Sequence, residues 1–133
     1  MMGILKVFSK TLLIVLLLCG LVTACKAGGI SPRTDAETIR RNFLAQTPVG
    51  TSFEDVMGKL SARGYRAIPS LTAGFLRQEQ GQLAVTVGVS SIRADIGDYW
   101  TFPFLTTSVS AFWGFDAEGK LMDIWIWKTT DAP

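Results

Sequence analysis

The side chains that could do chemistry in this 133-residue chain are few. The sequence has no histidine, so catalytic sites that use a histidine base and zinc sites that use histidine ligands are excluded. Asp95 and Asp98 flank Gly97, a spacing that could place two carboxylates on a hard cation or supply an acid/base pair. The surrounding residues are instead typical of a polar loop between strands, with Arg93 pairing locally. Because no phosphate-binding glycine loop or Ser-x-x-Lys pattern is present, we expect a protein that is not an enzyme and needs no cofactor or metal.

The remaining reactive group is a thiol that follows an apolar segment. Lys6 and Lys10 precede the apolar run 11–22, as in the positively charged and hydrophobic regions of a secretory signal. The run is about a dozen residues long, whereas a membrane-spanning helix needs about 20. The pattern predicts a signal peptide over residues 1–24, with a permanent single-span anchor as the alternative.

The segment Val22-Thr23-Ala24-Cys25 resembles the lipobox of bacterial lipoproteins, in which a cysteine is acylated and becomes the mature N-terminus. The resemblance implies a diacylglyceryl group on Cys25, and several acyl chains there would give stable membrane anchoring. The alternative is an unmodified cysteine. Lys26 follows the cysteine in place of the aspartate that retains lipoproteins in the inner membrane. The chain thus resembles a lipoprotein passed to the periplasmic face of the outer membrane, if the source is Gram-negative. We expect residues 25–33 to form a flexible tether, because glycine and proline there oppose regular structure.

The charge of the chain comes mainly from its signal. Removing residues 1–24 takes away two lysines and leaves 11 basic against 11 acidic side chains. A balanced domain has no basic surplus to attract nucleic acid. We therefore expect contact with the membrane through the lipid on Cys25 and a protein partner, without nucleic acid.

Two helices are predicted at the start of a single domain over residues 34–133. Thr34 and Glu37 form a capping-box pattern before a helical apolar spacing that ends ahead of Pro48. Arg40 and Arg41 are interpreted as its solvated face. A second capping box, formed by Thr51 and Glu54, precedes an apolar stripe of Phe53, Val56, Met57 and Leu60 and a C-capping Gly64.

After residue 71 the apolar period changes from 3.6 to 2, which predicts strands. The fold class is therefore α+β, with two N-terminal helices packed on one face of an antiparallel sheet of about four strands. Turn residues divide the region into the candidate strands 74–80, 82–90, 99–106, 108–116 and 120–129.

The last two candidate strands carry most of the tryptophan residues. If Gly119 forms a bulged turn, Asp116 faces Lys120, and this register places one set of side chains on one sheet face. Because two helices cover only one side of the sheet, and tryptophan often anchors interfaces, we expect a partner-binding surface on that face. Its predicted residues are Trp113, Asp123, Trp125 and Trp127, whereas packing in the core is the alternative for any one of them.

The order of tether, two helices and antiparallel sheet resembles the SmpA/OmlA (BamE-like) outer-membrane assembly factors, which have a β-lactamase-inhibitor-protein-like fold. The residues that carry this resemblance are the segment from Pro48 to Val56, at the start of the second helix. The Leu-Gly-x-Pro usual after that helix is absent, and the Trp-rich hairpin is not part of the pattern. The resemblance implies an architecture and an envelope location, and no binding residue is transferred.

Three functions follow from these patterns. The first is a lipid-anchored envelope protein that acts by protein contact, as an assembly or structural factor. The second is a periplasmic inhibitor or immunity lipoprotein that neutralises an enzyme through the Trp-rich face. The third is a lipoprotein that binds a small ligand in an aromatic cleft.

Overall fold

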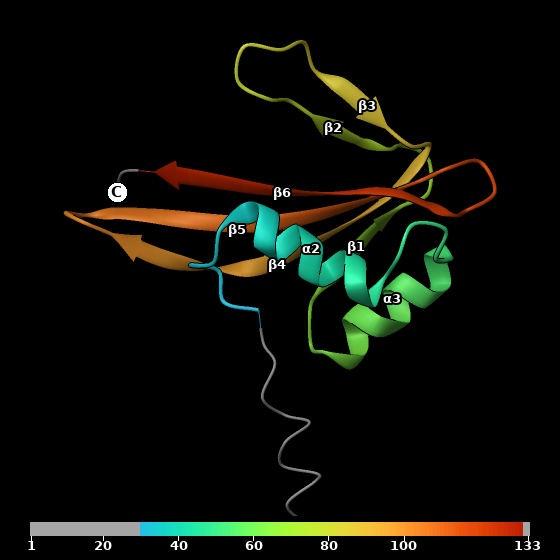
Figure 1. The fold of residues 1–133 in the computed structure, drawn as a ribbon, viewed down its shortest axis with the longest axis horizontal. Coiled ribbons are helices and arrows are strands. Elements are labelled where there is room, and N and C mark those ends of the chain that lie inside the picture. Colours follow the sequence, from blue (N-terminus) through green and yellow to red (C-terminus); the bar gives the residue numbers. More distant parts are fainter. Residues whose placement is uncertain (1–29, 132–133) are drawn as a thin grey trace, which may run out of the picture.

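The computed structural model describes residues 30–131, so the predicted signal peptide and Cys25 lie outside the described residues. Among residues 30–131, no helix is long and apolar enough to cross a membrane. Within the described residues, two helices precede six strands (Figure 1). They are α2 (Ala36–Gln46), α3 (Phe53–Ala62), β1 (Ala67–Ser70), β2 (Phe75–Arg77), β3 (Val85–Val87), β4 (Ser90–Thr101), β5 (Leu105–Phe115) and β6 (Leu121–Asp131).

The first helix, α2, begins one residue later than its capping pattern predicts. Asp35, rather than Thr34, is the N-cap, and its carboxylate accepts a hydrogen bond of 2.9 Å from the backbone N–H of Thr38. Hydrogen bonding to Thr38 lowers the pKa of Asp35. Aspartate is a stronger N-cap than threonine, which explains the shift. The apolar face buries Ile39 and Phe43 against the sheet.

The second helix, α3, is also capped one residue away from the predicted position. Ser52 accepts the capping hydrogen bond from the backbone N–H of Asp55, because the Thr51 hydroxyl donates to the carbonyl of Pro48 instead. The predicted role of Gly64 is confirmed by its φ of +81°. The N–H of Tyr65 donates to the carbonyl of Leu60 at 3.0 Å, which closes the last turn.

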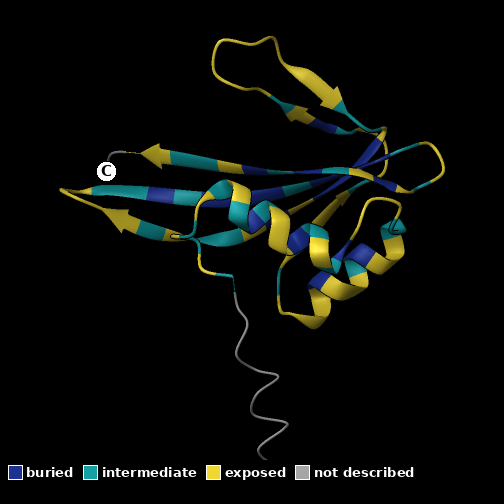
Figure 2. Ribbon diagram, viewed as in Figure 1, coloured by how far each residue is buried: buried dark blue, intermediate teal, exposed yellow. Residues whose placement is uncertain are grey.

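The α+β class and the helix-on-sheet arrangement are confirmed. Strands β1, β4, β5 and β6 form an antiparallel sheet in the order β1-β4-β5-β6, and the helices pack on one face of it. Figure 2 shows buried segments on both helices and along the strands behind them. The core between these layers consists mainly of Ile39, Phe43, Val56, Leu60, Ile92, Ala94, Val109, Ala111, Trp113, Phe115, Leu121, Ile124 and Ile126.

Several predicted strand limits were wrong. The region around Asp95 and Asp98 is not a loop, because it belongs to β4. This strand pairs with β5 from Ser90 to Thr101, with one bulge at Ile96. The alternation of apolar and charged residues in this segment is typical of a strand, and in the structure Ile92 and Ala94 are buried while Arg93 and Asp95 are exposed. The candidate strand 99–106 crosses the turn between β4 and β5. Strand β1 was missed because it is short and contains a proline, which is compatible only with a sheet edge.

The hairpin β5–β6 corrects the prediction about the tryptophan residues. The turn is as predicted, since the N–H of Asp116 donates to the carbonyl of Lys120. Beyond it, Phe115 pairs with Leu121 but Gly114 pairs with Asp123, so Met122 is an extra residue in β6. One extra residue exchanges the two faces of the strand. Trp113 therefore pairs with Ile124 in the core and is 0% exposed, and the expectation that it shares a face with the other two hairpin tryptophan residues was wrong.

A second, two-stranded sheet covers part of the face opposite the helices. Strands β2 and β3 form a hairpin that leans over one end of the large sheet (Figure 1). Glycine makes the close approach possible: a Cβ on Gly114 would lie 2.9 Å from side-chain atoms of both Phe75 and Val87. The face that the helices leave free is therefore covered in part by a segment of the same chain.

Candidate functional site

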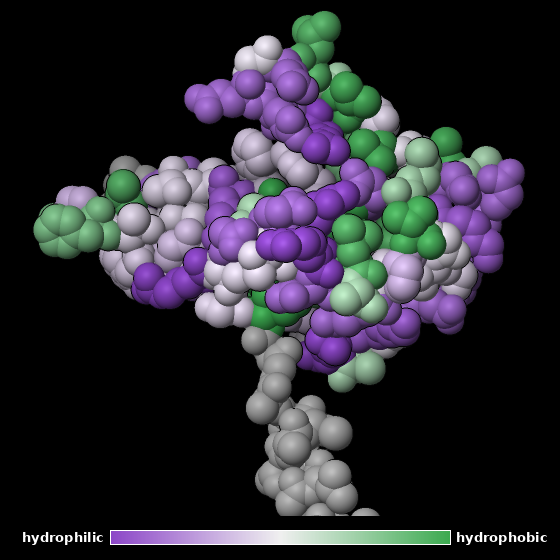
Figure 3. Space-filling model, viewed as in Figure 1, coloured by the Kyte–Doolittle hydropathy of each residue, from purple (hydrophilic) through white to green (hydrophobic). Residues whose placement is uncertain are grey.

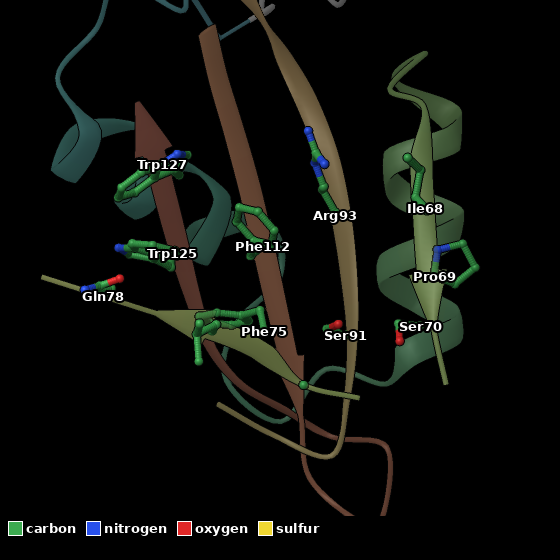
Figure 4. Close-up of a pocket in the computed structure, with 12 residues that line it drawn as sticks. Ile68, Pro69, Ser70, Phe75, Gln78, Ser91, Arg93, Phe112, Trp125 and Trp127 are labelled. Atoms are coloured by element: carbon green, nitrogen blue, oxygen red, sulfur yellow. The ribbon is translucent and has the colours of Figure 1, made fainter. Parts of the chain in front are cut away.

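A groove with a volume of about 510 Å³ lies between the β2–β3 hairpin and the uncovered face of the large sheet. Side chains from β1, β2, β4, β5 and β6 line it, and Figure 4 shows them gathered on one side of the sheet. We call it the aromatic groove, and its main residues are Phe75, Arg93, Phe112, Trp125 and Trp127.

The aromatic wall of the groove is a continuous series of rings. Phe75 stacks on Trp125 with 6.1 Å between ring centroids and 10° between planes. Phe112 lies 5.8 Å from Trp125, and Trp125 lies 5.1 Å from Trp127. Phe75 is buried, Trp125 and Phe112 are half-buried, and Trp127 is 42% exposed. The series therefore ends in an indole that is open to a ligand or partner.

The polar groups of the groove are few. Among the described residues that line it, Arg93 is the one that carries a charge. Its guanidinium lies 5.9 Å from the centroid of the Phe112 ring and donates to the Asp95 carboxylate at 3.1 Å. The Ser91 hydroxyl is already used, because it donates to the carbonyl of Ala73. The site can thus offer aromatic faces and one guanidinium, which suits binding by shape and apolar contact.

Asp123 was predicted to be a binding residue, but its oxygens are occupied within the fold. One carboxylate oxygen accepts from Arg40 on α2 at 2.7 Å, and the other accepts from Arg77 on β2 at 3.2 Å. Arg40 also donates from Nε to the carbonyl of Ile124. The hydrogen bond to Asp123 raises the pKa of Arg40, so Arg40 is not simply a solvated residue as the helix pattern indicated. Because β6 is an edge strand, Asp123 can bind at once to α2 on one face of the sheet and to the β2–β3 hairpin on the other.

The structure brings Trp125 and Trp127 together, and it excludes Trp113 from this site. The Trp113 indole packs edge-on against Phe43 and donates from Nε1 to the Thr47 hydroxyl at 3.3 Å, beneath the helices. Sequence reasoning missed Phe75, Arg93 and Phe112 as groove residues. Phe112 could have been assigned to this face by moving the register of β6 by one residue, but nothing local signals the bulge at Met122.

The alternative that Asp95 and Asp98 bind a cation gains no support. The Asp95 carboxylate accepts from Arg93 and from the Ser110 hydroxyl at 3.0 Å, so its charge is compensated within the strand pair. Over residues 30–131, no group of three or more potential metal-binding side chains is found. The local pairing of Arg93, which the sequence predicted, is confirmed.

Comparison with known proteins finds no matching family model, no matching curated protein and no matching solved structure.

Proposed function

We infer that this protein is a lipid-anchored protein of the bacterial envelope that binds a partner protein in its aromatic groove. The observation that carries the proposal is the continuous series of aromatic rings that ends in the exposed indole of Trp127. Tryptophan is one of the residues in which the energetic centres of protein interfaces are enriched. The lipid anchor is supported by the likeness of residues 22–25 to a lipobox.

The groove is held in shape before any partner arrives. Asp123 fixes the hairpin through Arg77 and the helix layer through Arg40, while Phe75 is stacked on Trp125. A rigid site loses little conformational freedom on binding, which favours affinity. The segment that best suits it carries an apolar or aromatic side chain for the rings and an acceptor oxygen for Arg93, whose side chain is 52% exposed.

The groove proposal is tested by crosslinking from inside and outside the site. A photoreactive residue at Leu76, which lines the groove and is exposed, should give a discrete adduct in whole cells. The same residue at Arg41, exposed on α2, should give none. Trp127→Ala in the Leu76-labelled chain should lower the adduct yield about tenfold or more, as loss of an interface centre does. Val49→Ala is the control, because Val49 is an exposed apolar residue outside the groove.

Equal adduct yields from the Leu76 and Arg41 positions, or no effect of Trp127→Ala, would contradict the groove as the binding surface. If the crosslinked partner is an enzyme that the wild-type protein inhibits and the Trp127→Ala variant does not, the inhibitor function is the right one.

A second candidate function is small-molecule binding, and the groove volume favours it. About 510 Å³ falls within the range of cavities that bind small organic ligands. In that case a small ligand should change the tryptophan fluorescence saturably, Trp127→Phe should remove much of the change, and the Leu76 position should give no protein adduct.

The anchor is tested separately by replacing Cys25. The wild-type chain should yield an N-terminal peptide that begins at Cys25 and carries the mass of a diacylglyceryl group. Cys25→Ser should keep residues 1–24 and carry no lipid, because a hydroxyl is a poor substitute for a thiolate nucleophile. Mass spectrometry of the purified chain measures both. A Cys25→Ser protein that is still cleaved and membrane-bound would contradict lipid anchoring.

A further inference from the structure

The end of β4 and the turn that leads to β5 carry three large aromatic side chains that the fold leaves uncovered. Trp100, Phe102 and Phe104 are 67%, 93% and 69% exposed. We call these three residues the aromatic tip. They belong neither to the core nor to the aromatic groove. These side chains gain little from folding, and an exposed apolar cluster of this kind marks an interaction site, so a contact that covers it is expected.

The aromatic tip is also free of charge. No charged residue occurs between Asp98 and Asp116, so the end of the hairpin presents only aromatic, aliphatic and hydroxyl side chains. The paired strands extend the tip away from the helices (Figure 1), and Figure 3 shows a hydrophobic surface at this end of the molecule. Beside this hairpin, β6 ends at the acidic residue Asp131, which pairs with Thr106. The loop itself is uncharged and carries tryptophan and phenylalanine, which fits the interfacial region of a lipid bilayer, where aromatic rings are enriched.

The described chain begins beside the same end of the sheet. Lys128 on β6 donates from Nζ to the carbonyls of Pro32 and Thr34, at 3.0 and 2.6 Å. Arg33 lies over the Tyr99 ring at 5.1 Å, and the ring atoms of Pro32 lie within contact distance of the Cβ position at Gly97. These contacts fasten the start of the domain to β4 between Gly97 and Tyr99.

Simple lengths show that the tip and the lipid can meet the same surface. From Gly97, which contacts Pro32, the strand continues five residues to Phe102, or about 17 Å. Cys25 precedes Ile30 by five residues, so the connecting chain reaches at most about 18 Å. A tether of this length keeps the domain against the bilayer, and the hairpin is long enough for its tip to reach it.

We propose that the aromatic tip inserts into the interfacial layer of the same bilayer that holds the lipid on Cys25. The proposal rests on the anchoring in the proposed function, and it adds a second, noncovalent contact that sets the orientation of the domain. With the tip at the membrane, the long strands rise from the surface and the β2–β3 hairpin lies at their far end, since Gly88 contacts Phe115 at the end of β5.

The test uses the full lipidated chain in vesicles of phosphatidylethanolamine and phosphatidylglycerol, with and without brominated acyl chains. Bromine quenches tryptophan only at close range, so quenching reports which indole lies in the bilayer. The wild-type protein should be quenched, and Trp100→Phe should lose most of that quenching. Trp127→Phe is the matched control, because it removes another exposed indole. It should leave the absolute loss of fluorescence caused by the brominated lipid unchanged.

A second variant keeps the Trp100 chromophore and changes only how well the tip can insert. Phe102→Ser combined with Phe104→Ser leaves Trp100 in place but weakens insertion, so the quenching of Trp100 should fall. Flotation of the vesicles measures the anchor in the same samples.

If the protein floats with the vesicles but Trp100→Phe keeps the full quenching, the tip contact is wrong and the anchor stands. If the wild-type protein does not float, both the anchor and the tip contact are contradicted. A blue-shifted Trp100 emission without quenching by brominated lipid would show that a protein surface covers the tip, which also overturns the proposal.

Discussion

Trp113→Ala is expected to destabilise the protein by about 3–5 kcal/mol, the usual cost of truncating a large aromatic residue in a core. The indole is 0% exposed and packs against the Phe43 ring, with 5.0 Å between ring centroids. Its N–H donates to the Thr47 hydroxyl. Truncation leaves a cavity between α2 and the sheet and removes that hydrogen bond. The midpoint of urea unfolding of the purified protein measures the loss.

The control for this prediction is a second tryptophan of the same hairpin. Trp127 is 42% exposed in the aromatic groove, so Trp127→Ala should cost less than about 1 kcal/mol of unfolding free energy. The two variants make the same chemical change on opposite faces of the sheet. Equal losses would mean that the two indoles share one environment, as the sequence suggested, and would contradict the bulge at Met122.

Gly88→Ala is expected to destabilise the protein by about 2–4 kcal/mol and to lift the β2–β3 hairpin from the sheet. Gly88 has a φ of +79°, which strains any residue that has a Cβ. Its Cβ would also lie 2.5 Å from the carbonyl oxygen of Phe115, and backbone cannot move aside as a flexible side chain can. Displacement of the hairpin would carry Phe75 away from Trp125 and open the aromatic groove.

The same hairpin provides a matched control for Gly88→Ala. Gly81 has a φ of +80°, but a Cβ there would meet no atom within 4 Å. Gly81→Ala therefore tests the backbone strain alone. It should lower the free energy of unfolding by about 1–2 kcal/mol and leave the groove intact. Urea unfolding gives the stabilities, and Trp125 fluorescence reports the stacking of Phe75. If both variants behave alike, the close approach of Gly88 to β5 is not what holds the hairpin down.

The helices were predictable because their signals are local. Apolar spacing and a left-handed glycine at position 64 fix one helix face and one helix end, and both agree with the structure. The exact capping residue was not fixed in the same way. At both helices two candidate cap residues are adjacent. At α2 the stronger cap, Asp35, takes the position, whereas at α3 Ser52 takes it because the Thr51 hydroxyl already donates to Pro48.

The candidate site was only partly predictable, because its position depends on one residue. Trp125 and Trp127 were correctly associated with each other, but the bulge at Met122 moves Trp113 to the opposite face and brings in Phe112. A bulge of this kind depends on the packing of both sheet faces rather than on a local turn signal. The role of Asp123 depends on Arg40 and Arg77, which lie far away in sequence and reach it only in the folded chain.

The edges of the large sheet restrict how any partner can bind. Pro69 interrupts the row of backbone donors along β1, the outer strand on one side. On the other side, Arg40 occupies the carbonyl of Ile124 and Met122 breaks the regular spacing of β6. Proteins protect exposed strand edges in these ways against uncontrolled association. A partner of this protein is therefore expected to meet the side chains of the groove rather than to extend the sheet by adding a strand, and recognition would depend on its residues and not on its backbone.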